Sequence, residues 1–149
     1  MKNRGFSLVE LLIIIAIMAV LSGALAPMLI RYINKSRLST DIDSGKALAT
    51  ALMSAAADES VGDAAEGYSG GPHSVSQMAD GAFKNAVFSV LGTDELVGKS
   101  KKDVDGNAFP HPEFYYTLDT ETGKVEVYYG DTSDDYQIYP VTGSKLVDN

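Results

Sequence analysis

The N-terminal part of the chain contains an apolar run that polar side chains hardly interrupt. Residues 11–30 form this run, and its departures from strongly apolar character are Ser22, Gly23 and Pro27. A helix of about 20 apolar residues is long enough to cross a hydrocarbon core of ~30 Å. The run therefore predicts a membrane-spanning helix. It is too long for a cleavable secretory signal, whose apolar core covers about 7–15 residues.

One acidic residue lies at the start of this helix. Glu10 is the only ionisable residue between Phe6 and Arg31. A carboxylate in an apolar segment costs about 2.5–3.5 kcal/mol at the helix centre and less near an end, so it commonly marks function. A plain signal anchor does not explain it. Glu10 follows Phe6 by four residues and shares its helix face, and a buried carboxylate needs a partner.

After Arg31 the pattern changes to a single apolar stripe. Its members recur every three or four residues, which is the period of an amphipathic helix. They are Leu38, Ile42, Gly45, Ala49, Leu52 or Met53, and Ala56. We therefore expect one long helix over residues 6–57. Its part 6–30 is the membrane or filament core, and its part 31–57 lies against the chain's own globular domain.

Residues 58–149 predict one small globular head, within the usual size of a domain. The Gly-rich stretch 58–72 is expected to be a loop, and 74–91 a helix that stops at Gly92. Alternation predicts a three-stranded antiparallel meander with strands at 113–118, 124–129 and 136–141. One apolar face of such a sheet needs cover. The fold class is therefore α+β, with the amphipathic half of the long helix on the sheet.

Charge and composition restrict the function of this head. The chain has 12 basic and 20 acidic residues and a net charge of −8, and the acidic excess lies in residues 58–149. Phosphate recognition needs clusters of Lys and Arg, so no direct nucleic-acid partner is expected. The chain has no cysteine, and its two histidines, His73 and His111, lack ligand spacing. No catalytic set stands out, and we expect a non-enzymatic protein without a cofactor.

Acidic loops are the candidates for a metal site. Asp131, Asp134 and Asp135 lie close together in one turn, and calcium takes 6–8 oxygen ligands. Residues 103–107 resemble the start of a calcium loop, but the glycine comes too early and the closing glutamate is missing. Because the whole head is acidic, a solvated turn is the preferred interpretation of both loops.

The first residues resemble the prepilin signature of type IV pilins and type II secretion pseudopilins. The resemblance rests on the sequence Gly-Phe-Ser-Leu-Val-Glu at positions 5–10, followed by the long apolar helix. It implies a leader peptide at residues 1–5, which a prepilin peptidase removes by cutting after Gly5, and methylation of Phe6. Glu10 would then pair with the new α-amine of Phe6 in a neighbouring subunit.

The resemblance also gives Gly23 and Pro27 an interpretation. Pro27 falls where type IV pilins commonly carry a helix-loosening proline, and Gly23 would replace the softening glycine that many pilins have at the position of Ala19. Proline removes a hydrogen bond from a helix and glycine lowers helix propensity. The two residues are therefore expected to form a joint that unwinds during assembly, although a harmless kink is the alternative.

The function implied by the resemblance is that of a pilus subunit for adhesion, motility or biofilm formation. The alternative is a pseudopilin of a type II secretion or DNA-uptake machine. The expected partners are copies of the chain in a helical homopolymer, the prepilin peptidase, the pilus assembly platform and, before assembly, the cytoplasmic membrane. The resemblance places the N-terminus inside and the head outside.

The positive-inside rule, taken literally, favours the opposite orientation, because Arg31, Lys35 and Arg37 follow the span. Two interpretations stay open for these three residues. They contact lipid headgroups, or they form an ordinary solvated helix face.

Overall fold

The computed structural model describes residues 7–147 of the 149. Contacts divide the chain within its first helix into two compact units, with the boundary between Asn34 and Lys35. The elements in chain order are α1 (Leu8–Ala56), α2 (Gly62–Glu66), β1 (Gly70–Ser74), η1 (Val75–Gln77), α3 (Ala82–Leu91), β2 (Phe114–Asp119), β3 (Lys124–Tyr129), η2 (Asp134–Tyr136) and β4 (Gln137–Tyr139), where η marks a short 3-10 helix.

The predicted long helix is confirmed as α1. In the second unit this helix buries one side only, and the buried positions recur at helical spacing. They are Leu38, Asp41, Ile42, Gly45, Leu48, Ala49, Ala51, Leu52 and Ala55. The apolar stripe of the sequence is therefore the side of α1 that enters the core of the second unit.

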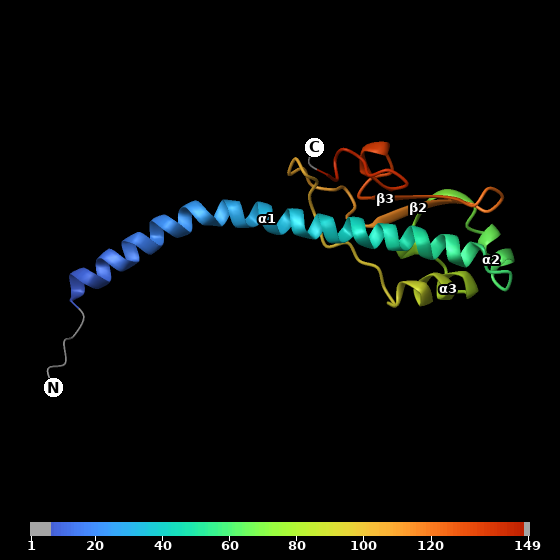
Figure 1. Ribbon diagram of the computed structural model, residues 1–149, viewed down its shortest axis with the longest axis horizontal. Helices are drawn as coiled ribbons and strands as arrows, with labels where there is room; N and C mark the ends of the chain where they lie inside the picture. Colours follow the sequence, from blue (N-terminus) through green and yellow to red (C-terminus); the bar gives the residue numbers. More distant parts are fainter. Residues whose placement is uncertain (1–6, 148–149) are drawn as a thin grey trace, which may run out of the picture. The chain divides into compact units, whose positions relative to one another are not determined.

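Four antiparallel strands form one sheet in the order β1-β2-β3-β4. Alternate side chains of β2 and β3 are buried. These are Phe114, Tyr116 and Leu118 from β2, and Val125, Val127 and Tyr129 from β3. They share one hydrophobic core with α1 and with Phe83 and Val87 of α3. Figure 1 shows α1 between the sheet and α3 in this unit. The predicted α+β arrangement of a helix on an antiparallel sheet is confirmed.

The prediction of three strands is wrong, because β1 adds a fourth at the edge of the sheet. It pairs with β2, so that His73 lies opposite Tyr116 and Ser74 opposite Tyr115. Residues 58–72 were predicted to form only a loop because of their glycines. The structure instead places the short helix α2 and most of β1 in that stretch.

The predicted helix at 74–91 is correct only in its second half, where α3 ends as expected at Gly92 in a left-handed conformation. Ser74 ends strand β1 and Ser76 lies in the short 3-10 helix η1, both before α3. Their hydroxyls donate to Glu113 Oε2, each at 2.6 Å. Serine side chains that bond elsewhere compete with helix formation. These contacts hold the segment at the sheet, and the helix begins only after Gly81.

The third predicted strand, 136–141, is shorter in the structure, because β4 covers only Gln137–Tyr139. Tyr136 belongs to η2. Pro140 follows the strand directly. Proline has no backbone N–H for the strand ladder, which accounts for the early end.

Candidate functional site

Helix α1 begins with a reciprocal cap formed by Ser7 and Glu10. The backbone N–H of Ser7 donates to Glu10 Oε2 at 2.9 Å, and the N–H of Val9 donates to Ser7 Oγ at 3.4 Å. The first N–H groups of a helix lack partners within it, and the Ser-x-x-Glu pattern supplies two acceptors. This role of Ser7 was not predicted from the sequence, although the spacing is the signature of a capping box. Glu10 therefore has a donor within its own chain.

The part of α1 that follows this cap exposes its large apolar side chains. From Leu8 to Ile33 these side chains are between 40% and 79% exposed. By length and composition α1 could cross a membrane, and its most apolar window is not buried. Covering apolar surface from water is worth about 25 cal/mol per Å². A helix of this kind needs lipid or other apolar helices around it.

Gly23 and Pro27 lie inside α1 without ending it. A Cβ at Gly23 would have no described atom within 4 Å. Packing within the described chain therefore does not require a glycine there, and a larger residue would fit. Proline lacks a backbone N–H and glycine has a low helix propensity, so both residues weaken the helix. Their role in assembly stays a proposal.

The processing residues Gly5 and Phe6 lie outside the described residues, and their role is inferred from the sequence alone. Residues 1–26 match the family model described as the prokaryotic N-terminal methylation motif. The chain carries the signature of type IV pilins and pseudopilins. This motif marks a structural, pilin-type protein that prepilin peptidase processes, and not an enzyme family. A search of curated proteins found no match, and neither did a search of solved structures.

The acidic turn uses its carboxylates for contacts within the head. Asp131 accepts the N–H of Ser133 at 2.9 Å, and Asp135 accepts the hydroxyl of Ser144 at 2.7 Å. Asp134 begins the short helix η2. Among residues 7–147, no group of three or more His, Cys, Asp or Glu is placed to hold a metal ion. The structure does not bring Asp131, Asp134 and Asp135 together as a ligand set.

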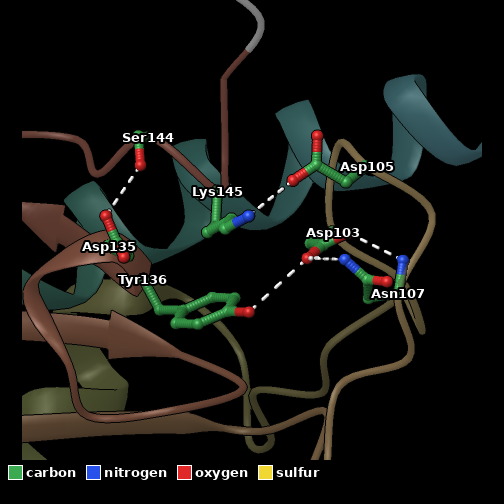
Figure 2. A network of polar contacts seen from close by, with 7 residues as sticks. All are labelled: Asp103, Asp105, Asn107, Asp135, Tyr136, Ser144 and Lys145. Carbon is green, nitrogen blue, oxygen red and sulfur yellow. Dashed lines mark hydrogen bonds and ion pairs between the residues drawn. The ribbon is translucent and has the colours of Figure 1, made fainter.

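The second candidate calcium loop is tied to the C-terminal segment, as Figure 2 shows. Asp103 is buried and accepts the backbone N–H of Asn107 at 2.8 Å and its side-chain amide at 3.1 Å. The hydroxyl of Tyr136 lies 3.5 Å from the Asp103 carboxylate. Asp105 forms an ion pair with Lys145 at 2.6 Å. These contacts give the loop a structural role, because they join two distant parts of the head.

A buried carboxylate in α1, which the sequence analysis did not single out, anchors the loop after α3. Asp41 is 1% exposed and accepts the backbone N–H groups of Lys99, at 2.9 and 3.1 Å, and of Ser100, at 2.6 Å. The hydroxyl of Tyr129 donates to the Ser100 carbonyl oxygen at 2.6 Å. Burial raises the pKa of Asp41, while these N–H groups oppose the rise by favouring its charged form. The signal was available, since Asp41 follows Leu38 by three residues on the apolar stripe.

Proposed function

We propose that this chain is the structural subunit of a type IV pilus filament. The observation that carries the proposal is the exposed apolar part of α1, behind an N-terminal methylation motif. Before assembly, residues 11–30 would hold the chain in the cytoplasmic membrane with the N-terminus inside and the head outside. In the filament, the same residues of neighbouring copies would replace the lipid and form a helical homopolymer.

Processing prepares the N-terminus for this assembly. Prepilin peptidase would cut after Gly5, and the new N-terminal Phe6 would be methylated. Its α-amine would pair with Glu10 of a neighbouring subunit, in surroundings of low dielectric constant where an unpaired charge is strongly destabilising. A carboxylate has two oxygens. One can accept the N–H of Ser7, as in this structure, while the other accepts the amine of the neighbour.

Gly23 and Pro27 would let the helix adapt to its neighbours in the filament. The assembly platform would extract the subunit from the membrane, and the weakened segment would lose helical hydrogen bonds as subunits pack. The mature filament would serve adhesion, motility or biofilm formation.

A pseudopilin of a type II secretion or DNA-uptake machine is the second candidate function. The specific observation in its favour is that the matched motif is also the signature of pseudopilins. Both candidates share membrane insertion, cleavage and the pairing of Phe6 with Glu10. They differ in whether the chain is the main component of long surface filaments.

The replacement Glu10→Ala tests assembly directly. Removal of one partner of a buried ion pair costs about 3–5 kcal/mol, so the yield of sheared filaments should fall at least about tenfold. The matched control is Glu59→Ala, which removes an exposed acidic side chain in the head. Both variants should be cleaved and reach the membrane fraction in wild-type amounts. A monomeric membrane-anchored binding protein predicts the contrary result, in which Glu10→Ala behaves like the control.

A further inference from the structure

A small pocket lies at the β1 edge of the sheet. Residues of β1, β2 and η1 line it, together with Tyr68 and Met78. Its volume is about 150 Å³. A water molecule has a share of about 30 Å³ in the liquid, so the pocket has room for one small organic molecule. Two of the lining residues, Pro72 and Gln77, are exposed, and a solute can therefore reach the pocket from the surface.

Two polar atoms of the lining residues have no hydrogen-bond partner among residues 7–147. They are Nε2 of His73 and the hydroxyl of Tyr116, and both atoms are buried. The two residues lie opposite each other on β1 and β2, and Tyr116 is fully buried. A buried polar atom without a partner destabilises a fold. A ligand that supplies partners to both atoms would remove this cost on binding.

His73 controls access to both atoms. Its side chain is half-buried on the edge strand, and its ring lies against that of Tyr116, with 5.7 Å between the ring centroids. The torsion that turns a histidine ring has broad minima, so the ring can rotate at low cost. A turn of this ring would open Nε2 and the Tyr116 hydroxyl to the pocket, while the backbone of β1 stays paired with β2.

The surroundings of the pocket disfavour a negatively charged ligand. None of the described residues that line it is Asp, Glu, Lys or Arg. An ion buried without a counter-charge is strongly disfavoured. Glu113 accepts the hydroxyl of Ser74, a lining residue, at 2.6 Å, and residues 58–149 contain 17 acidic and six basic residues. An anion would therefore be repelled as well.

The Tyr116 hydroxyl also disfavours a cation. Burial raises the pKa of this hydroxyl, so it keeps its proton and needs an acceptor. Ammonium and guanidinium groups have only donors, whereas an alcohol hydroxyl both donates and accepts. A neutral hydroxyl can thus accept from Tyr116 and donate to an unprotonated Nε2 of His73.

We propose that this pocket, which we call the polyol pocket, binds a small neutral molecule with neighbouring hydroxyl groups. One ligand hydroxyl would lie between Tyr116 and His73. The exposed amide of Gln77 would contact a second hydroxyl, and Pro72 and Met78 would pack against the carbon skeleton. The inference goes beyond the proposed function and depends on neither membrane insertion nor filament formation.

Histidine ¹⁵N spectra of the full chain test the polyol pocket. The chain, with ¹⁵N-labelled histidine, is held in detergent micelles and titrated with glycerol. His73 and His111 are its two histidines, and His111 is exposed and does not line the pocket. We expect the Nε2 resonance of His73 to move in a saturable way, while those of His111 stay in place. Glycerate, in which a carboxylate replaces one hydroxymethyl group, should bind at least about tenfold more weakly.

A matched pair of variants tests the role of the buried hydroxyl. Tyr116→Phe removes one hydrogen bond to the ligand and should weaken glycerol binding at least about fivefold. It should still fold, because the lost hydroxyl has no partner among the described residues, and thermal unfolding without glycerol checks this. Tyr128→Phe is the control. Its hydroxyl donates to Glu126 at 3.0 Å, away from the pocket, and its loss should leave glycerol binding unchanged.

Three results would overturn the proposal. In the first, glycerol moves neither histidine or moves both equally. In the second, glycerate binds as tightly as glycerol. In the third, Tyr116→Phe binds glycerol as tightly as wild type. Each of these results leaves the proposed function standing, because none of them concerns residues 1–30.

Discussion

Asp41 joins α1 to a residue 58 positions further along the chain, and this single side chain fixes the course of the loop after α3. Its carboxylate accepts hydrogen bonds from N–H groups that are buried and therefore cannot donate to water. Unsatisfied buried donors cost about 1–3 kcal/mol. We expect Asp41→Ala to lower the free energy of unfolding by about 2–3 kcal/mol. The measurement is urea unfolding of the full chain in detergent, followed by near-UV circular dichroism of the head tyrosines.

The control for that measurement is Asp43→Ala, which removes an exposed carboxylate from the same helix. Exposed substitutions of this kind usually change stability by at most about 0.5 kcal/mol. Equal unfolding curves for the two variants would show that the Asp41 contacts contribute nothing to stability.

Glu113 contributes to the stability of the head, and the size of this contribution depends on pH. The hydroxyls of Ser74, Ser76 and Tyr115 donate to its carboxylate and hold its pKa below the ordinary value of 4.5. A carboxyl whose pKa is lowered by folding stabilises the fold above its unfolded pKa, and this stabilisation is lost as pH falls through the folded pKa. We expect Glu113→Gln to cost about 1 kcal/mol near neutral pH.

Below pH 4.5 the difference between wild type and Glu113→Gln should shrink, because the wild-type carboxylate takes up a proton. Thermal unfolding over a pH series measures this. Glu121→Gln, an exposed replacement in the β2–β3 turn, is the control and should follow the wild-type curve. A Glu113→Gln curve parallel to that of wild type at every pH would contradict the account.

At the scale of elements, the close contact between α1 and β4 depends on a glycine. A Cβ at Gly45 would meet Ile138 Cδ1 and would lie 3.0 Å from its Cγ2, and Ile138 is fully buried. Overpacking a filled core costs about 1–3 kcal/mol. We expect Gly45→Val to lower the free energy of unfolding by about 2 kcal/mol in urea unfolding. Ala47→Val places the same side chain on the exposed face of α1 and should cost no more than about 0.7 kcal/mol.

Gly23 and Pro27 lower the helical stability of the apolar part of α1. The double replacement Gly23→Ala, Pro27→Ala should stabilise this helix, because an interior proline costs about 3 kcal/mol and a glycine about 1 kcal/mol relative to alanine. If the joint unwinds during assembly, the stiffer helix should reduce the yield of sheared filaments at least severalfold while membrane insertion stays unchanged. A wild-type filament yield would support the harmless kink instead.

The elements that the sequence predicted well are those with a strong local pattern. The buried stripe of α1 follows helical spacing from Leu38 to Ala55. Burial alternates along all of β2, and along β3 as far as Val127. Strand β1 could not be predicted in this way. Its sequence, Gly-Gly-Pro-His-Ser, has low strand propensity, and its place depends on pairing with β2 and on Glu113, which lies 39 residues from Ser74.

In the candidate site, too, local patterns were predicted and contacts between distant segments were not. Residues 5–10 and the apolar run are local signals, and they led directly to the methylation motif at residues 1–26. The anchoring of the loop at 99–102 by Asp41 is a contact between distant segments. No spacing along the chain indicates which loop a buried carboxylate will bind, so the anchoring by Asp41 is seen only in the folded head.

At the scale of the whole molecule, two different surfaces coexist in one chain. The first unit exposes an apolar helix, and the second has its own core of buried side chains. A helix that is apolar on all sides is stable in lipid or in a bundle of similar helices. We propose that the chain passes from lipid into a bundle of similar helices after the removal of residues 1–5.

The intact mass of the chain in filaments sheared from cells tests this passage from lipid to filament. We expect the dominant filament chain to lack residues 1–5 and to carry one additional methyl group. A cleaved and methylated chain that stays in the membrane and is absent from filaments would favour the pseudopilin. An uncleaved chain would rule out both kinds of filament subunit and leave a simple membrane-anchored domain.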